Sequence, residues 1–411
     1  MKRIGIVLVL FSAFLTVSCK QKKQAESLKT PDDHIAFIES QLEFADKQLS
    51  GLLVKAEAKN QNPRTLEKDS SIYFIDSASF DWTEGFFPGS CWYLYEATGA
   101  DKWKDAAMHF QGLYKSHKEL PAYHDLGFVF NCSYGNGYRL LDKPEYKTVL
   151  MDAAKTLANR FDPKVGAIKS WDADRGWQAK RGWEYPVIID NMMNLELLYE
   201  ATAMSSDSVY AKIASAHADK TMAHHFRDDY SSYHVIDYDS ITGNVRKKET
   251  AQGFADSSSW ARGQAWGLYG YTMCYKYTKD QKYLDMANKI ADYILNASEI
   301  PKDGIPYWDY HTSDKETTPR DVSAAAVTAS ALVSLNNFTA GKYEQEALNL
   351  VQTLSTPVYR SELNTNENFL LKHSVGSIPH DNEIDVPLNY ADYYYLEALL
   401  RIKTYYSKKK K

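Results

Sequence analysis

The sequence predicts an all-α protein, an (α/α)6 barrel of six helical hairpins in a single domain over residues 34–406. Two observations predict this fold. Apolar residues recur at helical spacing along most of the chain, whereas alternating strand patterns are short and scattered. The connections alternate between very short and long, which places all the long loops on one face of a ring of antiparallel helix pairs. An open solenoid is the alternative, but it would not gather the long loops over one centre.

Helical spacing is clearest in the segment 280–297, where Tyr283, Met286, Ile290 and Ile294 recur at steps of three or four and so share one face. Twelve segments have this character, although two glycines weaken the fourth. The expected helices are 34–57, 84–98, 101–117, 129–141, 144–161, 187–203, 206–225, 258–278, 280–297, 321–339, 341–354 and 388–406.

Five of the connections are very short and similar to one another, and each is soon followed by an aromatic residue. They indicate a weak internal repeat of helix, tight turn and helix, in which the second helix returns beside the first. The turns are at 98–101, 141–144, 204–207, 278–280 and 339–341, and the aromatic residues are Trp103, Tyr146, Tyr210, Tyr283 and Tyr343.

The composition is that of a globular protein, with 44% hydrophobic and 25% charged residues and a net charge of −5. A chain without a basic excess is a poor partner for nucleic acid, so that class is excluded. Aromatic residues are unusually frequent at 13%, which favours a groove that stacks sugar rings. Seven of the nine tryptophans lie on or beside the long loops: Trp82, Trp171, Trp177, Trp183, Trp260, Trp266 and Trp308.

The first residues predict export. Lys2 and Arg3 precede an apolar run that ends at Ser18 and Cys19, too short for a membrane-spanning helix and typical of a signal peptide over residues 1–18. The end of the run resembles a bacterial lipobox, which would make Cys19 the lipidated first residue of a periplasmic or membrane-anchored lipoprotein. An ordinary cleaved signal is the alternative. Residues 19–33 are then a lipidated N-terminus and flexible tether, and residues 407–411 a basic tail.

The remaining cysteines, Cys91, Cys132 and Cys274, are far apart and lack metal-ligand spacing, so we expect buried free thiols. The pair Asp172 and Asp174 resembles only part of a calcium loop, and a solvated loop is the better interpretation. No metal site is predicted.

Two acidic stretches on the long-loop side could carry a reaction. His124 and Asp125 place an imidazole beside a carboxyl, and Asp190 follows three β-branched residues at the expected start of a helix. Apolar neighbours disfavour a charged carboxyl and raise its pKa, as a general acid requires. Glycosidases typically use two carboxyl groups, which here would come from facing helix starts. Both aspartates could equally be helix caps.

A third stretch contains Arg262 and Trp266, four residues apart and therefore on one face of a helix. A guanidinium beside an indole suits a sugar that carries a carboxylate, because the fork binds the acid and the ring stacks on the pyranose. An Arg–Trp pair within a packing surface is the alternative.

Four motifs in order resemble the unsaturated glucuronyl hydrolases, glycoside hydrolase family 88, over residues 34–406. They are His124-Asp125-Leu126-Gly127-Phe128, Ile189-Asp190-Asn191-Met192-Met193-Asn194, Trp260-Ala261-Arg262-Gly263-Gln264-Ala265-Trp266 and Asn389-Tyr390-Ala391-Asp392-Tyr393-Tyr394. The resemblance implies an (α/α)6 barrel, which agrees with the hairpin pattern. It also implies removal of the 4,5-unsaturated uronic acid that polysaccharide lyases leave at the non-reducing end, by hydration of the C4=C5 enol ether and without a cofactor.

The resemblance further implies the roles of individual residues. Asp190 would be the general acid and base, and Asp125 would position the substrate and stabilise developing positive charge. The residues implied to bind the substrate are Trp82, His124, Trp177, His234, Gln252, Arg262 and Trp266.

The polysaccharide that supplies the substrate stays open, between glycosaminoglycan and ulvan types. Some relatives carry a serine-and-lysine motif for a sulfate; here Ser374 and Ser377 are present, but Pro379 stands where that lysine is expected. Two other functions remain as alternatives, an ordinary inverting glycosidase on the same barrel and a non-catalytic sugar-binding lipoprotein. The expected partner is the unsaturated oligosaccharide, with the membrane reached only through the lipid anchor, and no oligomeric state is predicted.

Overall fold

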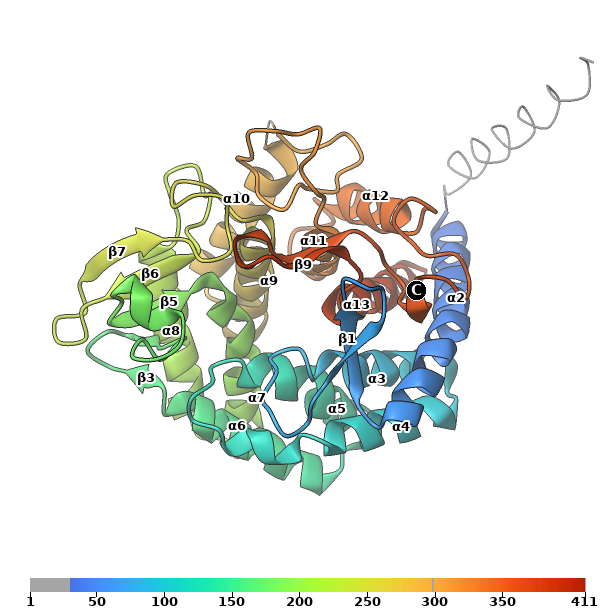
Figure 1. Cartoon of the computed structure of the whole chain (residues 1–411), viewed down its shortest axis with the longest axis horizontal. Helices are drawn as coiled ribbons and strands as arrows, with labels where there is room; N and C mark the ends of the chain where they lie inside the picture. Colours follow the sequence, from blue (N-terminus) through green and yellow to red (C-terminus); the bar gives the residue numbers. More distant parts are fainter. Residues whose placement is uncertain (1–29, 298, 411) are drawn as a thin grey trace, which may run out of the picture.

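The computed structural model describes residues 30–297 and 299–410, and it has the predicted (α/α)6 barrel. Six inner units form a closed ring, each in contact with the next: α3, the π-helical segment η2 with α5, α7, α9, α11 and α13. Closure of this ring excludes the open solenoid. Figure 1 shows the helix pairs following one another around the ring in chain order.

The helices have the following bounds: α2 Pro31–Lys59, α3 Phe86–Thr98, α4 Asp101–Gly112, η1 Lys115–Glu119, η2 Gly127–Gly135, α5 Asn136–Leu141, α6 Pro144–Ala158, η3 Gln178–Arg181, η4 Ile189–Asn194, α7 Leu195–Ser205, α8 Val209–His224, α9 Ala261–Thr278, α10 Gln281–Asn296, α11 Val322–Asn336, α12 Glu344–Leu354, η5 Asn366–Asn368, η6 Ile378–His380 and α13 Asn389–Lys409.

Five of the six pairs are hairpins, and the sixth is made by the two ends of the described chain. Helix α2 packs against α13, where the rings of His34 and Tyr406 stack at 4.5 Å. The predicted count of six therefore holds, although one pair has no connecting turn. This arrangement closes the ring with contacts between residues more than 300 positions apart.

Four of the short turns share one backbone device, which explains the internal repeat. Gly99, Asp142, Ser206 and Lys279 each follow an inner helix in the left-handed conformation, with φ between 48° and 69°. The N–H of each donates to the carbonyl four residues earlier at 2.8–2.9 Å. This αL cap satisfies one of the last carbonyls of the helix and reverses the chain.

The β-strands all lie in the long connections, so they gather at the end of the barrel opposite the short turns. They form four small sheets: three are two-stranded hairpins, and the fourth is a three-stranded antiparallel sheet in the order β5-β6-β7. The strands are β1 Asn62–Leu66, β2 Ile72–Ile75, β3 Phe161–Asp162, β4 Ala167–Ile168, β5 Tyr185–Ile188, β6 Val235–Tyr238, β7 Val245–Glu249, β8 Ser374–Ser377 and β9 Asn382–Val386.

One predicted helix is wrong at its start. The segment expected to be helical from residue 187 begins instead as strand β5, which pairs Val187 with Ile236 and Ile188 with Val235, and continues as the 3-10 turn η4. The β-branched run before Asp190 favours a strand, and its partner strand lies about fifty residues further on, beyond the reach of a local pattern.

The two chain ends also differ from the prediction. Helix α2 begins at Pro31, inside the expected tether, because Thr30 and Asp33 form a capping box and proline suits the first helical position. Helix α13 continues through Lys409, so residues 407–409 of the expected tail are helical. The predicted signal peptide and the lipidated Cys19 lie outside the described residues.

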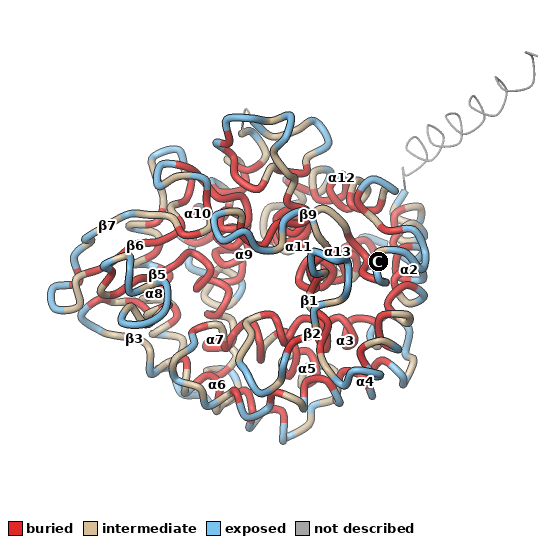
Figure 2. The backbone as a smooth tube through the Cα atoms, in the orientation of Figure 1, coloured by how far each residue is buried: buried red, intermediate tan, exposed pale blue. Residues whose placement is uncertain are grey.

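The core lies between the two rings of helices, and Figure 2 shows the buried backbone concentrated there. Every residue of the inner helix α11 except one is buried, whereas the outer helix α10 buries only one face. Cys91, Cys132 and Cys274 are buried and free, as predicted. Among the described residues, no helix combines the length and apolar character needed to cross a membrane.

Candidate active site

Asp190 lies at the long-loop end of the barrel, on the turn η4 between strand β5 and helix α7. The preceding Ile189 N–H donates to the carbonyl of His234 at 3.0 Å, so the three-stranded sheet holds this turn in place. Burial of the Asp190 side chain raises its pKa to about 7, and the charge of Arg262 acts in the opposite direction. A carboxyl with this pKa can give up and take back a proton near neutral pH.

Asp125 comes from the segment that enters the π-helix η2, and its Oδ1 lies 3.1 Å from Nε2 of His124. Burial raises the pKa of Asp125 well above its usual range, and the charge of Asp190 raises it further. The structure therefore brings the two predicted acids into one site. Two carboxyls that interact in this way titrate as a unit.

His234 is held as a neutral hydrogen-bond donor. Its Nδ1 accepts the backbone N–H groups of Ala251 and Gln252, both at 3.1 Å, so the proton of the neutral ring is on Nε2. That Nε2 lies 3.6 Å from Oδ2 of Asp190. Burial, followed by the charge of Arg262, lowers the pKa of His234 well below its usual range. Burial also lowers the pKa of His124.

Arg262 is wholly buried and its guanidinium already has protein partners. Nη1 donates to Oδ2 of Asp321 at 2.9 Å and to the carbonyl of Val375, and Nη2 donates to the carbonyl of Gly376 at 2.6 Å. The ring beside the guanidinium is Trp260, 4.3 Å from the ring centre, and not Trp266 as the helical spacing predicts. Arg262 thus anchors strand β8 beside the carboxyls, and its role in binding the uronate stays a prediction.

Aromatic rings line the site on two sides. On the first side, the ring of Phe128 lies 5.4 Å from Trp82 and 5.1 Å from Trp266. On the second side, Trp171 lies 6.0 Å from His234 and 5.1 Å from Trp177.

Trp177 contacts Trp171, whose ring in turn lies near His234, and it is also 5.1 Å from the ring of His380. It is 37% exposed, which suits a wall at the entrance rather than a core residue. The last predicted residue, Gln252, lies between two elements of the site: its N–H binds His234, and its side-chain Nε2 donates to the carbonyl of Gly376 at 3.3 Å.

Several buried polar atoms converge here without a hydrogen-bond partner among the described residues. They include four atoms of predicted site residues: His124 Nε2, Asp190 Oδ2, His234 Nε2 and Trp266 Nε1. Buried polar groups are nearly always paired, so a concentration of unpaired ones indicates a site built for a ligand. The helix-cap alternative also fails for both aspartates, because neither accepts a capping hydrogen bond from the helix that follows.

Sequence reasoning missed three residues of this site. The guanidinium of Arg262 lies 5.4 Å from the ring centre of Tyr390, whose hydroxyl is buried and unpaired within the described chain, as is the indole nitrogen of Trp260. Tyr390 and Trp260 belong to motifs quoted above, so the sequence did contain a signal for a role in the site. Asp321, 59 positions after its partner Arg262, gave no such signal.

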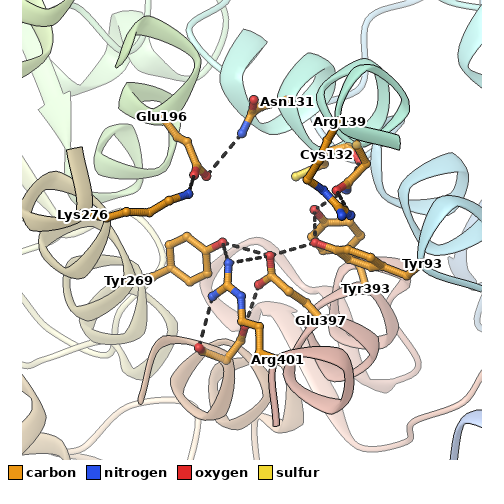
Figure 3. A network of polar contacts seen from close by, with 12 residues as sticks. Tyr93, Asn131, Cys132, Arg139, Glu196, Tyr269, Lys276, Tyr393, Glu397 and Arg401 are labelled. Atoms are coloured by element: carbon orange, nitrogen blue, oxygen red, sulfur yellow. Dashed lines mark hydrogen bonds and ion pairs between the residues drawn. The ribbon is translucent and has the colours of Figure 1, made fainter. Parts of the chain in front are cut away.

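A cavity of about 800 Å³ lies at the other end of the barrel, among the short turns. Its centre is a network in which Glu397 accepts hydrogen bonds from Tyr93 at 2.8 Å, Tyr269 at 3.0 Å and Ser330 at 2.6 Å (Figure 3). None of the unpaired buried atoms of the described chain lies on its lining residues. The network satisfies itself, so the chemistry is assigned to the long-loop end.

An (α/α)6 barrel with two buried carboxyls and tryptophan walls at its loop end defines a glycosidase. An unsaturated glucuronyl hydrolase of Formosa agariphila is 43% identical over 402 residues, 97% of this chain and 98% of the relative. An unsaturated chondroitin disaccharide hydrolase of Streptococcus pyogenes is 33% identical over 353 residues, 84% of this chain and 86% of the relative. The chain belongs to the unsaturated glucuronyl hydrolases, glycoside hydrolase family 88.

A solved structure agrees with this assignment. An unsaturated glucuronyl hydrolase specific for heparin superimposes with a TM-score of 0.84 and 44% identity, covering 91% of this chain and 98% of that one. A scan against family models found no match. Among the described residues, no group of three or more His, Cys, Asp or Glu side chains is placed to hold a metal ion. The similarity to these relatives shows that the protein is a glycosidase that acts on unsaturated uronic acid sugars.

Proposed function

We propose that Asp190 is the general acid and base that hydrates the C4=C5 enol ether of the terminal unsaturated uronic acid. The observation that supports this role is the Asp190 carboxyl itself, buried, with a pKa raised to about 7 and with Oδ2 unpaired within the described chain. A group that donates a proton and then accepts one from water needs a pKa near the working pH.

The reaction consumes one water and returns Asp190 to its starting state. Protonated Asp190 gives its proton to C4, and positive charge develops at C5 and on the ring oxygen. The carboxylate of Asp125 stabilises that charge. Asp190 then takes a proton from water as the water oxygen bonds to C5, which gives a hemiketal. The hemiketal opens to a ketone, and the hemiacetal left at C1 collapses to an aldehyde and releases the next sugar as its alcohol.

The other site residues hold the uronate in place. The Nε2–H of neutral His234 and the indole N–H of Trp266 are donors without a protein acceptor among the described residues, so they can bind oxygens of the substrate or the attacking water. His124, Gln252 and Arg262 complete the polar wall. Trp82 and Trp177 are the faces on which sugar rings stack.

For the source of the substrate, we propose glycosaminoglycan disaccharides, heparin type first. The support is the 44% identity to an unsaturated glucuronyl hydrolase specific for heparin, together with the relative named for chondroitin disaccharides. In this chain the hydroxyl of Ser374 is buried and unpaired within the described residues, and Ser377 contacts Nδ1 of His380 at 2.6 Å. Ulvan fragments are the competing source.

The test of this function is the ultraviolet absorbance of the C4=C5 double bond in lyase-generated disaccharides of heparin, chondroitin, gellan and ulvan type. We expect the absorbance to fall with the wild-type enzyme and to persist with Asp190→Asn. Asp392→Asn is the matched control, because Asp392 is also buried with a pKa raised to about 7, but its carboxyl accepts the backbone N–H groups of Leu370 and Leu371.

Unchanged absorbance with every disaccharide would overturn the hydration proposal. Release of a saturated sugar, with the double bond intact in the other product, would instead favour an ordinary inverting glycosidase. Binding without any turnover would favour a sugar-binding lipoprotein.

We also propose that the protein is exported and anchored by a lipid on Cys19, as a periplasmic or membrane-anchored lipoprotein. The apolar run behind Lys2 and Arg3 and the serine before Cys19 support this proposal. Cells grown with labelled palmitate should label the wild-type protein and leave Cys19→Ser unlabelled. Label in both proteins, or in neither, would count against the anchor.

A further inference from the structure

The two carboxyl-bearing segments of the site are joined by a chain of buried amides. Asn194, at the end of the turn that carries Asp190, accepts the backbone N–H of Phe128 through Oδ1 at 3.0 Å. Phe128 lies three residues after Asp125, on the segment that carries the second carboxyl. A single side chain thus connects two segments that are 66 residues apart.

This hydrogen bond fixes the orientation of the Asn194 amide. Because Oδ1 accepts from Phe128, the Nδ2 group faces the other way, toward Oδ1 of Asn191 at 3.3 Å and toward the Asp125 carboxyl. Asn191 is oriented in turn, since its Nδ2 donates to the carbonyl of Ile168 at 2.8 Å and to Oγ of Ser170 at 2.9 Å. Neither asparagine is exposed.

The chain of buried amides continues through Ser170 to the segments that carry Trp171 and Asp190. Oγ of Ser170 accepts the N–H of Ile188, two residues before Asp190, at 2.9 Å, and Trp171 follows Ser170 directly. The contact between the segments is also very close at Gly127, where an added Cβ would lie 2.3 Å from Cα of Asn194. Both the amides and the glycine therefore hold the two segments at one separation.

We propose that Asn194, oriented by Asn191, is a positioning residue that sets the spacing of Asp125 and Asp190 and presents its amide N–H to the Asp125 carboxyl. Two equivalent acids would share one proton and perform neither role well. Burial raises the pKa of Asp125, and the charge of Arg160 and the Asn194 N–H act in the opposite direction. An aspartate at position 194 could still accept the Phe128 N–H, but it could not donate to Asp125.

The inference rests on the proposed roles of the two acids, and it is tested with Asn194→Asp and Asn194→Ala in the full chain. Turnover of the disaccharide that the wild type hydrates is measured against pH. Activity needs ionised Asp125, so the acidic limb of the kcat profile marks its protonation. Loss of the Asn194 donor should raise the pKa of Asp125 and move that limb to higher pH in both variants, further in Asn194→Asp because it adds a negative charge.

Asn336→Ala is the matched control for general destabilisation. Asn336 is equally buried and its Oδ1 also accepts a backbone N–H, from Tyr343 at 2.8 Å, but it lies beside a short turn. This variant should lower the melting temperature and leave the pH profile in place.

If both Asn194 variants fold and retain the wild-type acidic limb, Asn194 is merely structural and the inference is overturned. If Asn194→Ala fails to fold, Asn194→Asp, which has the same shape and keeps the Phe128 bond, decides the question alone. A wild-type enzyme that hydrates no disaccharide would instead overturn the proposed function, so the two failures are distinguishable.

Discussion

Nε2 of His234 lies 3.6 Å from Oδ2 of Asp190, and neither atom has a hydrogen-bond partner within the described residues. Two backbone N–H groups occupy Nδ1 of His234 from the other side, so the ring presents a fixed N–H to the acid. A histidine held in this way acts as a donor and does not exchange protons with the substrate. This geometry supports the proposal that the proton moved in the reaction belongs to the Asp190 carboxyl.

This geometry predicts that His234 does not titrate over the physiological range. Burial, followed by the charge of Arg262, lowers its pKa well below the usual range, so the ring should stay neutral near neutral pH, where an unperturbed histidine changes charge. Nitrogen NMR of the labelled enzyme should show the Nε2–H tautomer throughout. A protonated His234 near neutral pH would contradict the assignment.

Asp190→Asn should fold and lower kcat by about 10²- to 10⁴-fold, the usual contribution of general acid–base catalysis. In the wild type, kcat should fall as pH rises through about 7, because the raised pKa means that Asp190 loses its proton there. Stopped turnover assays across pH check both results. A kcat that continues to rise well above that pH would argue against Asp190 as the acid. The control variant Asp392→Asn should keep the alkaline limb of the wild-type kcat profile.

Arg262→Ala should raise KM and also move the alkaline limb of kcat to higher pH. The limb moves because the positive charge of Arg262 lowers the pKa of Asp190, so its removal raises that pKa further. The same change leaves the buried carboxylate of Asp321 without its partner, at a cost of about 3–5 kcal/mol in stability.

Arg262→Lys separates the two effects of that substitution. Lysine keeps a positive charge near Asp190, so the alkaline limb should stay close to its wild-type position. It cannot reproduce the three bonds of the planar fork to Asp321 and strand β8, so KM should still rise. An unchanged KM in both variants would show that Arg262 has no part in holding the uronate.

Glu397→Ala should destabilise the barrel and spare the chemistry. At the short-turn end of the barrel, the Glu397 carboxylate receives hydrogen bonds from Tyr93, Tyr269, Ser330 and Arg401, which come from four inner helices (Figure 3). Loss of the carboxylate leaves Arg401 without its main partner, at a cost of about 3–5 kcal/mol. The melting temperature should fall while the pH profile of kcat is retained. A shifted profile would mean that the short-turn end of the barrel is coupled to the site.

The fold could be predicted from the sequence because its signals are local. Helical spacing identified the barrel helices, and the similar short turns indicated their pairing, since each turn needs only an αL residue and four neighbouring positions. Strand β5 was missed because its partner β6 is distant in the sequence. The pairing of α2 with α13, which come from the two ends of the described chain, was missed for the same reason.

The site was predictable in part. Asp125, Asp190 and His234 follow from residue type and from family resemblance, and the structure brings them together. The partners that determine their behaviour were not predictable. Asp321 accepts a hydrogen bond from the guanidinium of Arg262, and two backbone N–H groups fix the tautomer of His234. Both contacts depend on the packing of loops that carry no motif.

Trp177→Ala should raise KM and leave kcat nearly unchanged. The ring is 37% exposed at the entrance, it contacts Trp171 and His380, and none of its contacts reaches either carboxyl directly. Its contribution is therefore to hold a sugar in both the ground state and the transition state, and uniform binding of that kind appears in KM alone. Stacking on an aromatic face contributes about 0.5–1.5 kcal/mol, so KM should rise by a factor of about 2 to 12. Trp177→Phe keeps a flat face and should restore most of the loss. A fall in kcat, or an equal KM for the alanine and phenylalanine variants, would contradict a stacking role and place Trp177 in the support of Trp171 instead.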